Sequence, residues 1–207
     1  MTEPISFELP RQNVTIVGSF NPAIFHPSWV REHVPQIRDE IQTLMPAEGG
    51  PPLCHADELY WTVTPERLVA YGPPRQTGGV VATILTTLCH TPLRAAGVNF
   101  LFKGKAPRER CGPWRIAVSV EDTSALLRGS PGELALSQAV QREDGVRVTL
   151  KLVWPSEEPE VVLDLNYHLA ARESRNEARA KELAAHAERA SEFAADAERI
   201  SRELLHG

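Results

Sequence analysis

Alternating apolar and polar positions predict strands along most of the first 169 residues. Residues 13–20 (NVTIVGSF) show the pattern clearly, with β-branched side chains on both faces. Seven further runs share this texture. We therefore expect about seven or eight strands, at residues 13–20, 59–63, 67–71, 96–102, 114–120, 134–140, 146–154 and 161–169.

Two pairs of these runs are predicted to form hairpins. Thr64-Pro65-Glu66 separates one pair, and proline suits the first central position of a turn. Glu143-Asp144-Gly145 separates the other pair, and Asp-Gly suits the positive-φ positions of a tight turn. Hairpins of this kind favour an antiparallel sheet.

Apolar residues at helical spacing predict two helices between the strands. From Trp29 to Leu44 the spacing is helical, with Ser28 as the expected cap, and Pro35 makes this helix short, kinked or restarted. Residues 77–79 (Thr-Gly-Gly) are expected to open a second helix, which ends before Pro92.

The chain from Arg172 to Leu205 is rich in Ala, Glu and Arg and contains no Gly or Pro, which predicts a long helix. Its apolar positions form a narrow seam at heptad spacing. Two interpretations stay open: the seam packs on the chain's own sheet, or it contacts a protein partner or second copy. The interface candidates are Leu183, Ala187, Ala190, Phe193, Ala194, Ala197, Ile200 and Leu204.

The order of elements predicts an α+β fold, with a largely antiparallel sheet, helices on one face and a long C-terminal helix. We expect residues 1–169 to form this domain and residues 170–207 to form the helix. A short echo between residues 98–102 and 165–169 raises the alternative of two similar halves within the domain.

Composition places the chain among soluble globular proteins. It has 207 residues, of which 42% are hydrophobic and 24% charged, and a formal net charge of −5. No apolar run approaches the ~18 residues that span a bilayer, and the N-terminus does not resemble a signal peptide. Three widely spaced cysteines favour a reducing compartment, so we expect a cytoplasmic protein. The net acidity disfavours nucleic acid as a partner.

The stretch at residues 18–22 (Gly-Ser-Phe-Asn-Pro) resembles the phosphate-binding segment of nucleotidyltransferases that make adenylated cofactors. In that family two histidines separated by one residue and a glycine follow the motif. Here Ile24 and Pro27 occupy the histidine positions and His26 occupies the glycine position. This departure disfavours the enzyme, and a strand end followed by an Asn-Pro turn is the simpler interpretation.

The tripeptide Leu-Cys-His occurs twice, at residues 53–55 and 88–90. Two cysteines and two histidines are a ligand set that zinc accepts. Adjacent residues point in different directions, however, and no pair has the usual spacing of zinc ligands. We therefore assign no metal and no cofactor, and leave open whether Cys54, His55, Cys89 and His90 meet in space.

The loop at residues 103–115 concentrates positive charge in an acidic chain. It offers cations for a phosphate or an acidic partner and an indole for stacking, although a solvated loop is the commoner case. The candidate nucleic-acid or phosphate-binding residues are Lys103, Lys105, Arg108, Arg110, Trp114 and Arg115.

Catalytic groupings are sparse. Ser19 with His26 fits no known nucleophile motif, and neither does His55 with its acidic neighbours. Asp164, Asn166 and His168 alternate along one strand face, which a solvated sheet face also explains. We assign no catalytic residue and expect a binding protein rather than an enzyme.

Four segments carry turn and packing motifs, at residues 20–29, 63–68, 88–100 and 163–167. Together they resemble a sporadically distributed group of uncharacterised bacterial proteins. The resemblance implies a cytoplasmic α+β protein, with a duplicated sheet of the TATA-binding-protein-like kind as one form, and it implies no activity.

These observations lead to three functional hypotheses. The first is a binding or assembly module that acts through its sheet and C-terminal helix, homo-oligomeric or part of a bacterial complex. The second is a nucleotide or nucleic-acid binder that uses the loop at residues 103–115. The third, disfavoured by the motif mismatch, is a nucleotidyltransferase-like enzyme.

Overall fold

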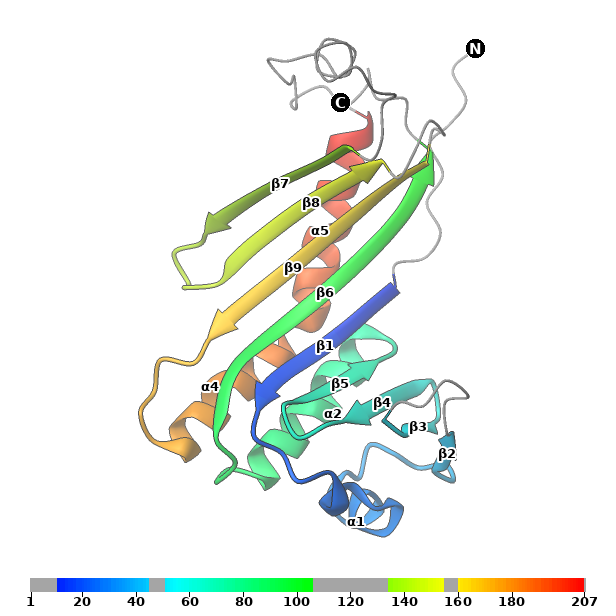
Figure 1. The fold of residues 1–207 in the computed structure, drawn as a ribbon, viewed down its shortest axis with the longest axis vertical. Coiled ribbons are helices and arrows are strands. Elements are labelled where there is room, and N and C mark those ends of the chain that lie inside the picture. Colours follow the sequence, from blue (N-terminus) through cyan, green and yellow to red (C-terminus); the bar gives the residue numbers. More distant parts are fainter. Residues whose placement is uncertain (1–10, 45–50, 106–133, 155–159, 207) are drawn as a thin grey trace, which may run out of the picture.

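The computed structural model describes residues 11–44, 51–105, 134–154 and 160–206. In this part of the chain one nine-stranded antiparallel sheet carries the helices on one face (Figure 1), which confirms the expected α+β class. The helical segments are η1 (Pro22–Phe25), α1 (Pro27–His33), α2 (Pro74–Thr87), α4 (Asn176–Glu188) and α5 (Ala190–His206). The strands are β1 (Arg11–Gly18), β2 (Gln42–Leu44), β3 (Leu53–Ala56), β4 (Leu59–Val63), β5 (Arg67–Tyr71), β6 (Leu93–Lys105), β7 (Leu134–Gln141), β8 (Arg147–Trp154) and β9 (Glu160–Ala170).

The strand order is β2-β3-β4-β5-β1-β6-β9-β8-β7, so β1 and β6 form the centre. From β1 the chain passes to the outer strand β2 and returns through β3 and β4 to β5, which pairs with β1. From β6 it continues at the outer strand β7 and returns through β8 to β9, which pairs with β6. Two similar halves stay a prediction, with which this shared path is consistent. The short sequence echo lies in β6 and β9, which are neighbours in one half.

The core lies between the sheet and the helices α2, α4 and α5. Side chains alternate between the two faces of each strand, so every second strand residue faces the helices. Phe100 on β6, Tyr167 on β9 and Phe193 on α5 are among the largest fully buried side chains. Tyr167 joins them, since its ring stacks on Phe193 at 4.7 Å between centroids and meets Phe100 edge-on at 5.9 Å.

Of the forms expected for the helix near Trp29, the short one is observed: α1 ends at His33, because Val34 caps it just before Pro35. Two other features near the N-terminus differ from the sequence predictions. The N-cap of α1 is His26 rather than Ser28. Residues 42–44 and 53–56 instead form β2 and β3, which the sequence did not predict as strands.

The C-terminal segment forms two helices rather than one long helix. The helix α4 ends at Glu188 and α5 begins at Ala190, with Arg189 between them at φ −74° and ψ 4°. The Arg189 guanidinium donates to the Glu192 carboxylate and to Asp144 in the β7–β8 turn, at 2.7 to 2.9 Å. Tertiary contacts therefore hold the residue at the break, where helix propensity alone predicts continuity.

Among the described residues, no helix combines the length and apolar character needed to cross a lipid bilayer. The predicted strand at residues 114–120 lies outside the described residues.

Candidate functional site

The face of the sheet opposite α2, α4 and α5 is not covered by these helices, and we call it the open face. In Figure 1 the strands lie in front of the helices, so the viewer looks onto the open face. One residue from each strand lies in a single line across it, because neighbouring strands pair in register. This cross-sheet row consists of Gln42, His55, Tyr60, Tyr71, Asn13, Asn99, Asn166, Thr149 and Ala139.

Three asparagines form the centre of the cross-sheet row. The Asn99 amide donates to the Asn13 Oδ1 at 2.8 Å, and the Asn166 amide donates to the Asn99 Oδ1. Thr15 also donates to the Asn13 Oδ1, at 2.9 Å. Within the described part of the chain, the Asn13 Nδ2 and the Asn166 Oδ1 at the two ends have no hydrogen-bond partner. The row thus offers a donor at one end and an acceptor at the other.

Aromatic side chains continue the row on the β3 side. Tyr60 and Tyr71 lie opposite each other and are 38% and 41% exposed, whereas most large hydrophobic residues that the structure describes are buried. The His55 ring stacks on Tyr60, with 4.2 Å between centroids and 20° between planes. This part of the open face can therefore pack against apolar groups or stack with aromatic rings of a ligand or partner.

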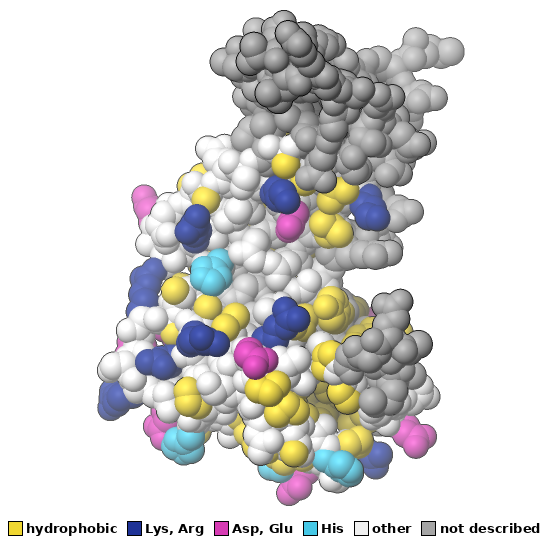
Figure 2. Space-filling view, in the orientation of Figure 1, with side chains coloured by type: hydrophobic (Ala, Val, Ile, Leu, Met, Phe, Trp, Pro, Cys, Tyr) yellow, Lys and Arg dark blue, Asp and Glu magenta, His cyan; other side chains and the backbone are white. Residues whose placement is uncertain are grey.

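The open face is positively charged in a chain of net negative charge. Figure 2 shows Lys and Arg side chains spread over this face. Among the strand residues of this face whose side chains are described, the strand alternation gives four basic residues and one carboxylate. The basic residues are Arg67, Lys103, Arg147 and Lys151, and the carboxylate is Asp164.

Two titratable groups of this face have shifted pKa values. Burial raises the pKa of Asp164, and Lys151, which lies opposite on β8, partly offsets this effect. Burial also lowers the pKa of His168, and the neighbouring Arg147 lowers it further. Both shifts favour the neutral form of the group. The prediction that Asp164, Asn166 and His168 align on one strand face is confirmed by their pairing partners on β6 and β8.

The seam of the C-terminal helices does not face solvent. Leu183, Ala187, Ala190, Phe193 and Ala197 are at most 1% exposed and belong to the chain's own core. Ala194 and Ile200 are partly buried and pack against the same core. The interface proposed for these residues is therefore corrected: of the two sequence-based interpretations, packing on the chain's own sheet is the observed one. Of Leu204, only its place in α5 is described.

Most of the basic loop lies outside the described residues, including Arg108, Arg110, Trp114 and Arg115. Lys103 and Lys105 belong to the end of β6. Lys103 is exposed and lies on the open face by strand alternation. One residue of the predicted basic site thus contributes to the positive charge described above.

The Gly-Ser-Phe-Asn-Pro stretch ends β1 and starts η1. The backbone N–H of Ala23 donates to the Asn21 side chain at 3.1 Å, as in a helix cap. His26 is exposed, and its Nδ1 lies 2.9 Å from the Ser28 hydroxyl oxygen. The ring therefore caps the N-terminus of α1. Phe25 contacts both Phe20 and Trp29, with ring centroids 6.3 and 5.5 Å apart, so aromatic packing joins the end of β1 to α1.

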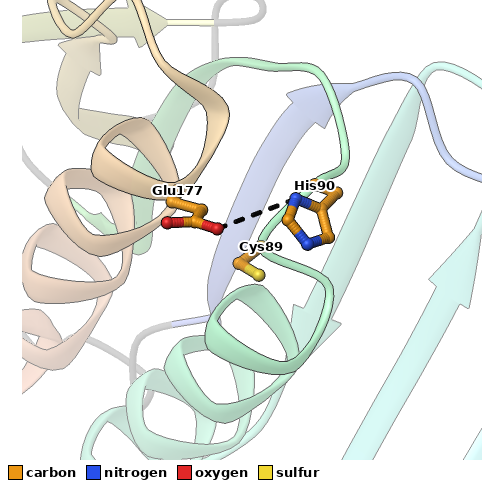
Figure 3. Close-up of side chains that lie close together, drawn as sticks. All are labelled: Cys89, His90 and Glu177. Carbon is orange, nitrogen blue, oxygen red and sulfur yellow. Dashed lines mark ion pairs between the residues drawn. The ribbon is translucent and has the colours of Figure 1, made fainter.

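The two Leu-Cys-His tripeptides lie on different elements, one on β3 and one just after α2. The second tripeptide meets α4 instead: the potential ligand atoms of Cys89, His90 and Glu177 all lie within 4.8 Å of one another (Figure 3). The His90 Nδ1 is 4.0 Å from the Glu177 carboxylate, and both side chains are largely exposed. Asn176 also donates to the His90 carbonyl at 3.0 Å, which ties α4 to the end of α2.

The surroundings of this cluster do not favour a metal ion. His90 and Glu177 line an open cavity of about 510 Å³, which Arg175 and Lys181 also line. The N-terminus of α4 adds a positive field at the same place. Two basic side chains and a helix N-terminus repel a divalent cation, so we interpret the cluster as a polar contact between α2 and α4.

Comparison with known families and with curated proteins finds no family model and no curated protein that matches the chain. The resemblance to a group of bacterial proteins, and the fold kinship it implies, therefore stay predictions.

Sequence reasoning identified Asn166 but missed Asn13, Asn99, Tyr60 and Tyr71 as members of one site. Each lies on a predicted strand: Asn99 and Tyr60 lie between two buried neighbours, and Asn13 and Tyr71 each lie next to one. That alternation was a usable signal for the open face. The alignment of these residues in one cross-sheet row was not predictable from alternation, because the register is fixed by pairing between distant strands.

Proposed function

We propose that the chain is a binding module that takes a protein partner with an acidic surface on its open face. The observation that carries this proposal is the cross-sheet row, which joins an amide network to exposed aromatic rings on the sheet face that α2, α4 and α5 leave open. Strands lie about 4.8 Å apart, so the row extends for about 38 Å. A surface of this length and mixed chemistry suits a macromolecule better than a small ligand.

The charge of the open face supports an acidic partner. Arg147 and Lys151 lie on either side of the cross-sheet row on β8, an arrangement in which charges steer the partner and the row supplies packing and hydrogen bonds. The unpartnered Asn13 Nδ2 and Asn166 Oδ1 can be satisfied by groups of the partner's backbone.

A second candidate is single-stranded nucleic acid. The stacked His55 and Tyr60, with Tyr71 beside them, favour it, because bases stack on exposed aromatic rings next to cations. The net charge of −5 weakens the attraction of the whole molecule for a polyanion, which is why we rank this partner second.

Binding of defined probes separates the two candidates. Fluorescence anisotropy would be measured at low salt with a labelled polyglutamate peptide and with a labelled oligothymidylate. We expect the peptide to bind and Arg147→Glu with Lys151→Glu to weaken binding by about tenfold or more, equivalent to ~1.4 kcal/mol. The matched control, Arg175→Glu with Lys181→Glu, reverses two exposed charges at the N-cap and on the N-terminal half of α4, and leaves peptide binding nearly unchanged.

The other outcomes are equally informative. Oligothymidylate binding that Tyr60→Ala with Tyr71→Ala weakens, in the absence of peptide binding, replaces the first candidate with the second. Side-chain amide signals of Asn13, Asn99 and Asn166 in an NMR spectrum shift on binding if the open face is the site. Absence of binding by both probes at low salt contradicts both proposals.

A further inference from the structure

The strand β7 forms one edge of the sheet and has no strand on its outer side within the described residues. All eight of its residues, Leu134–Gln141, pair with β8 in continuous register, without a bulge. The opposite edge, β2, has only three residues. The edge of the sheet at β7 is therefore long and regular, and it presents backbone groups that can pair with another strand.

β7 lacks the features that usually protect an edge strand. Its sequence, LALSQAVQ, contains no charged residue, no proline and no glycine. The six of its side chains that are described are exposed, and Val140 is 53% exposed. Proteins generally place lysine, proline or a bulge on such an edge to prevent pairing between molecules. The absence of these devices from β7 indicates that pairing is used.

An apolar groove lies beside this edge on the helix face. Its volume is about 230 Å³, and it lies between β7, β8 and α5, with Val140, Val148, Leu150 and Ile200 in its lining. The charged groups at the groove, Arg142 and Asp196, form an ion pair at 3.4 Å and so add no unpaired charge. The groove runs to the sheet edge, where Val140 is left uncovered by α5.

We infer that β7 pairs antiparallel with β7 of a second copy of the chain, around a twofold axis perpendicular to the sheet. The two nine-stranded sheets then become one continuous sheet. Such an axis keeps the helices of both copies on the same face, so the two apolar grooves meet at the axis and shield each other from water. An uncharged edge is self-complementary, as a twofold interface requires.

The β7 side chains on the open face also permit this pairing. Ala135, Ser137 and Ala139 lie there by strand alternation and are small and uncharged. The pairing extends the open face across both copies and covers none of it. The inference is therefore independent of the partner proposed above for the open face.

Sedimentation equilibrium of the full chain tests the inference. We expect a dimer whose dissociation constant rises at least tenfold in Val140→Lys, because a charged side chain then enters the apolar contact between the two copies. The matched control is Gln42→Lys on the exposed opposite edge β2, which leaves the dimer unchanged. Circular dichroism and the thermal midpoint of each variant check that the monomer fold is retained.

A disulfide cross-link identifies the occupant directly. Strands paired antiparallel bring opposite Cα atoms to within about 5.5 Å, which a disulfide can bridge. We expect oxidation of Gln138→Cys or Ser137→Cys to give a covalent dimer. Gln42→Cys should give no more covalent dimer than the native thiols give in the wild-type chain. A wild-type chain that stays monomeric at all concentrations overturns the inference. So does a dimer that neither Val140→Lys nor the cross-links affect.

Discussion

At the residue scale, His186 on α4 is a titratable side chain inside the core. It is 2% exposed, and its Nε2–H donates to the Tyr167 carbonyl at 3.0 Å, while the Nδ1 has no partner among the described residues. Its pKa is lowered to about 4, mainly by burial; the Tyr167 carbonyl and Asp144 oppose this shift, whereas the nearby Arg189 and His168 add to it. The ring is therefore neutral at pH 7 and carries its proton on Nε2.

This environment predicts a loss of stability in mild acid. The unfolded chain binds a proton at His186 near pH 6.5, whereas the folded chain resists it until about pH 4. The contribution is complete above pH 6.5 and disappears as the pH falls through this window, by roughly 3 kcal/mol in total. Urea denaturation at several pH values should show a shallower pH dependence of the free energy of unfolding in His186→Gln. An identical slope in the variant would contradict the assignment.

At the element scale, α2 crosses the junction of α4 and α5 so closely that only glycine fits at one position. A Cβ on Gly78 would lie 2.4 Å from the Ala187 carbonyl oxygen and 3.2 Å from the Ala190 Cβ, whereas a Cβ on Gly79 would meet no atom within 4 Å. The Gly-Gly pair, expected from the sequence to open this helix, thus lies inside it, four residues after its start at Pro74.

The neighbouring glycines form a matched test of this crossing. We expect Gly78→Ala to lower the free energy of unfolding by about 1–3 kcal/mol, because backbone must move to admit the methyl group. Gly79→Ala should raise it by about 0.5–1 kcal/mol, because alanine favours the helix and finds open space. Urea denaturation of both variants measures the difference, and equal effects would show that the crossing is looser than described.

The elements differ in how well the sequence predicted them. The hairpins of β4 with β5 and β7 with β8 followed from local patterns, and the second has Gly145 at φ 84° in its turn, as Asp-Gly predicts. The break at Arg189 did not, because the ion pairs that hold it come from Asp144 and Glu192 in the folded chain. The asparagine network has the same cause: each asparagine is visible in the sequence, but Asn13, Asn99 and Asn166 meet only through pairing of distant strands.

At the scale of the whole molecule, the C-terminal helices are part of the core rather than an appendage. Phe193 shows this best, since it is fully buried, stacks on Tyr167 of the sheet, contacts His186 of α4 and lies 4.7 Å beneath the Arg189 guanidinium. The expected separation into residues 1–169 and a helix at 170–207 is not directly tested, but these contacts join the two segments closely. We therefore expect the sheet and the helices to unfold together.

Replacing Phe193 distinguishes a core residue from an interface residue. In a core, Phe193→Ala costs about 3–5 kcal/mol because it removes buried apolar area and leaves a cavity. In an interface, the same change weakens association and leaves the stability of the monomer nearly intact. We expect the first result, with one cooperative transition in circular dichroism and tryptophan fluorescence. Glu198→Ala, on the exposed side of the same helix, should change stability by less than about 0.5 kcal/mol, since it removes only the surface ion pair with Arg202. A stable Phe193→Ala monomer with weaker self-association would return the seam to the interface and move the contact between copies away from β7.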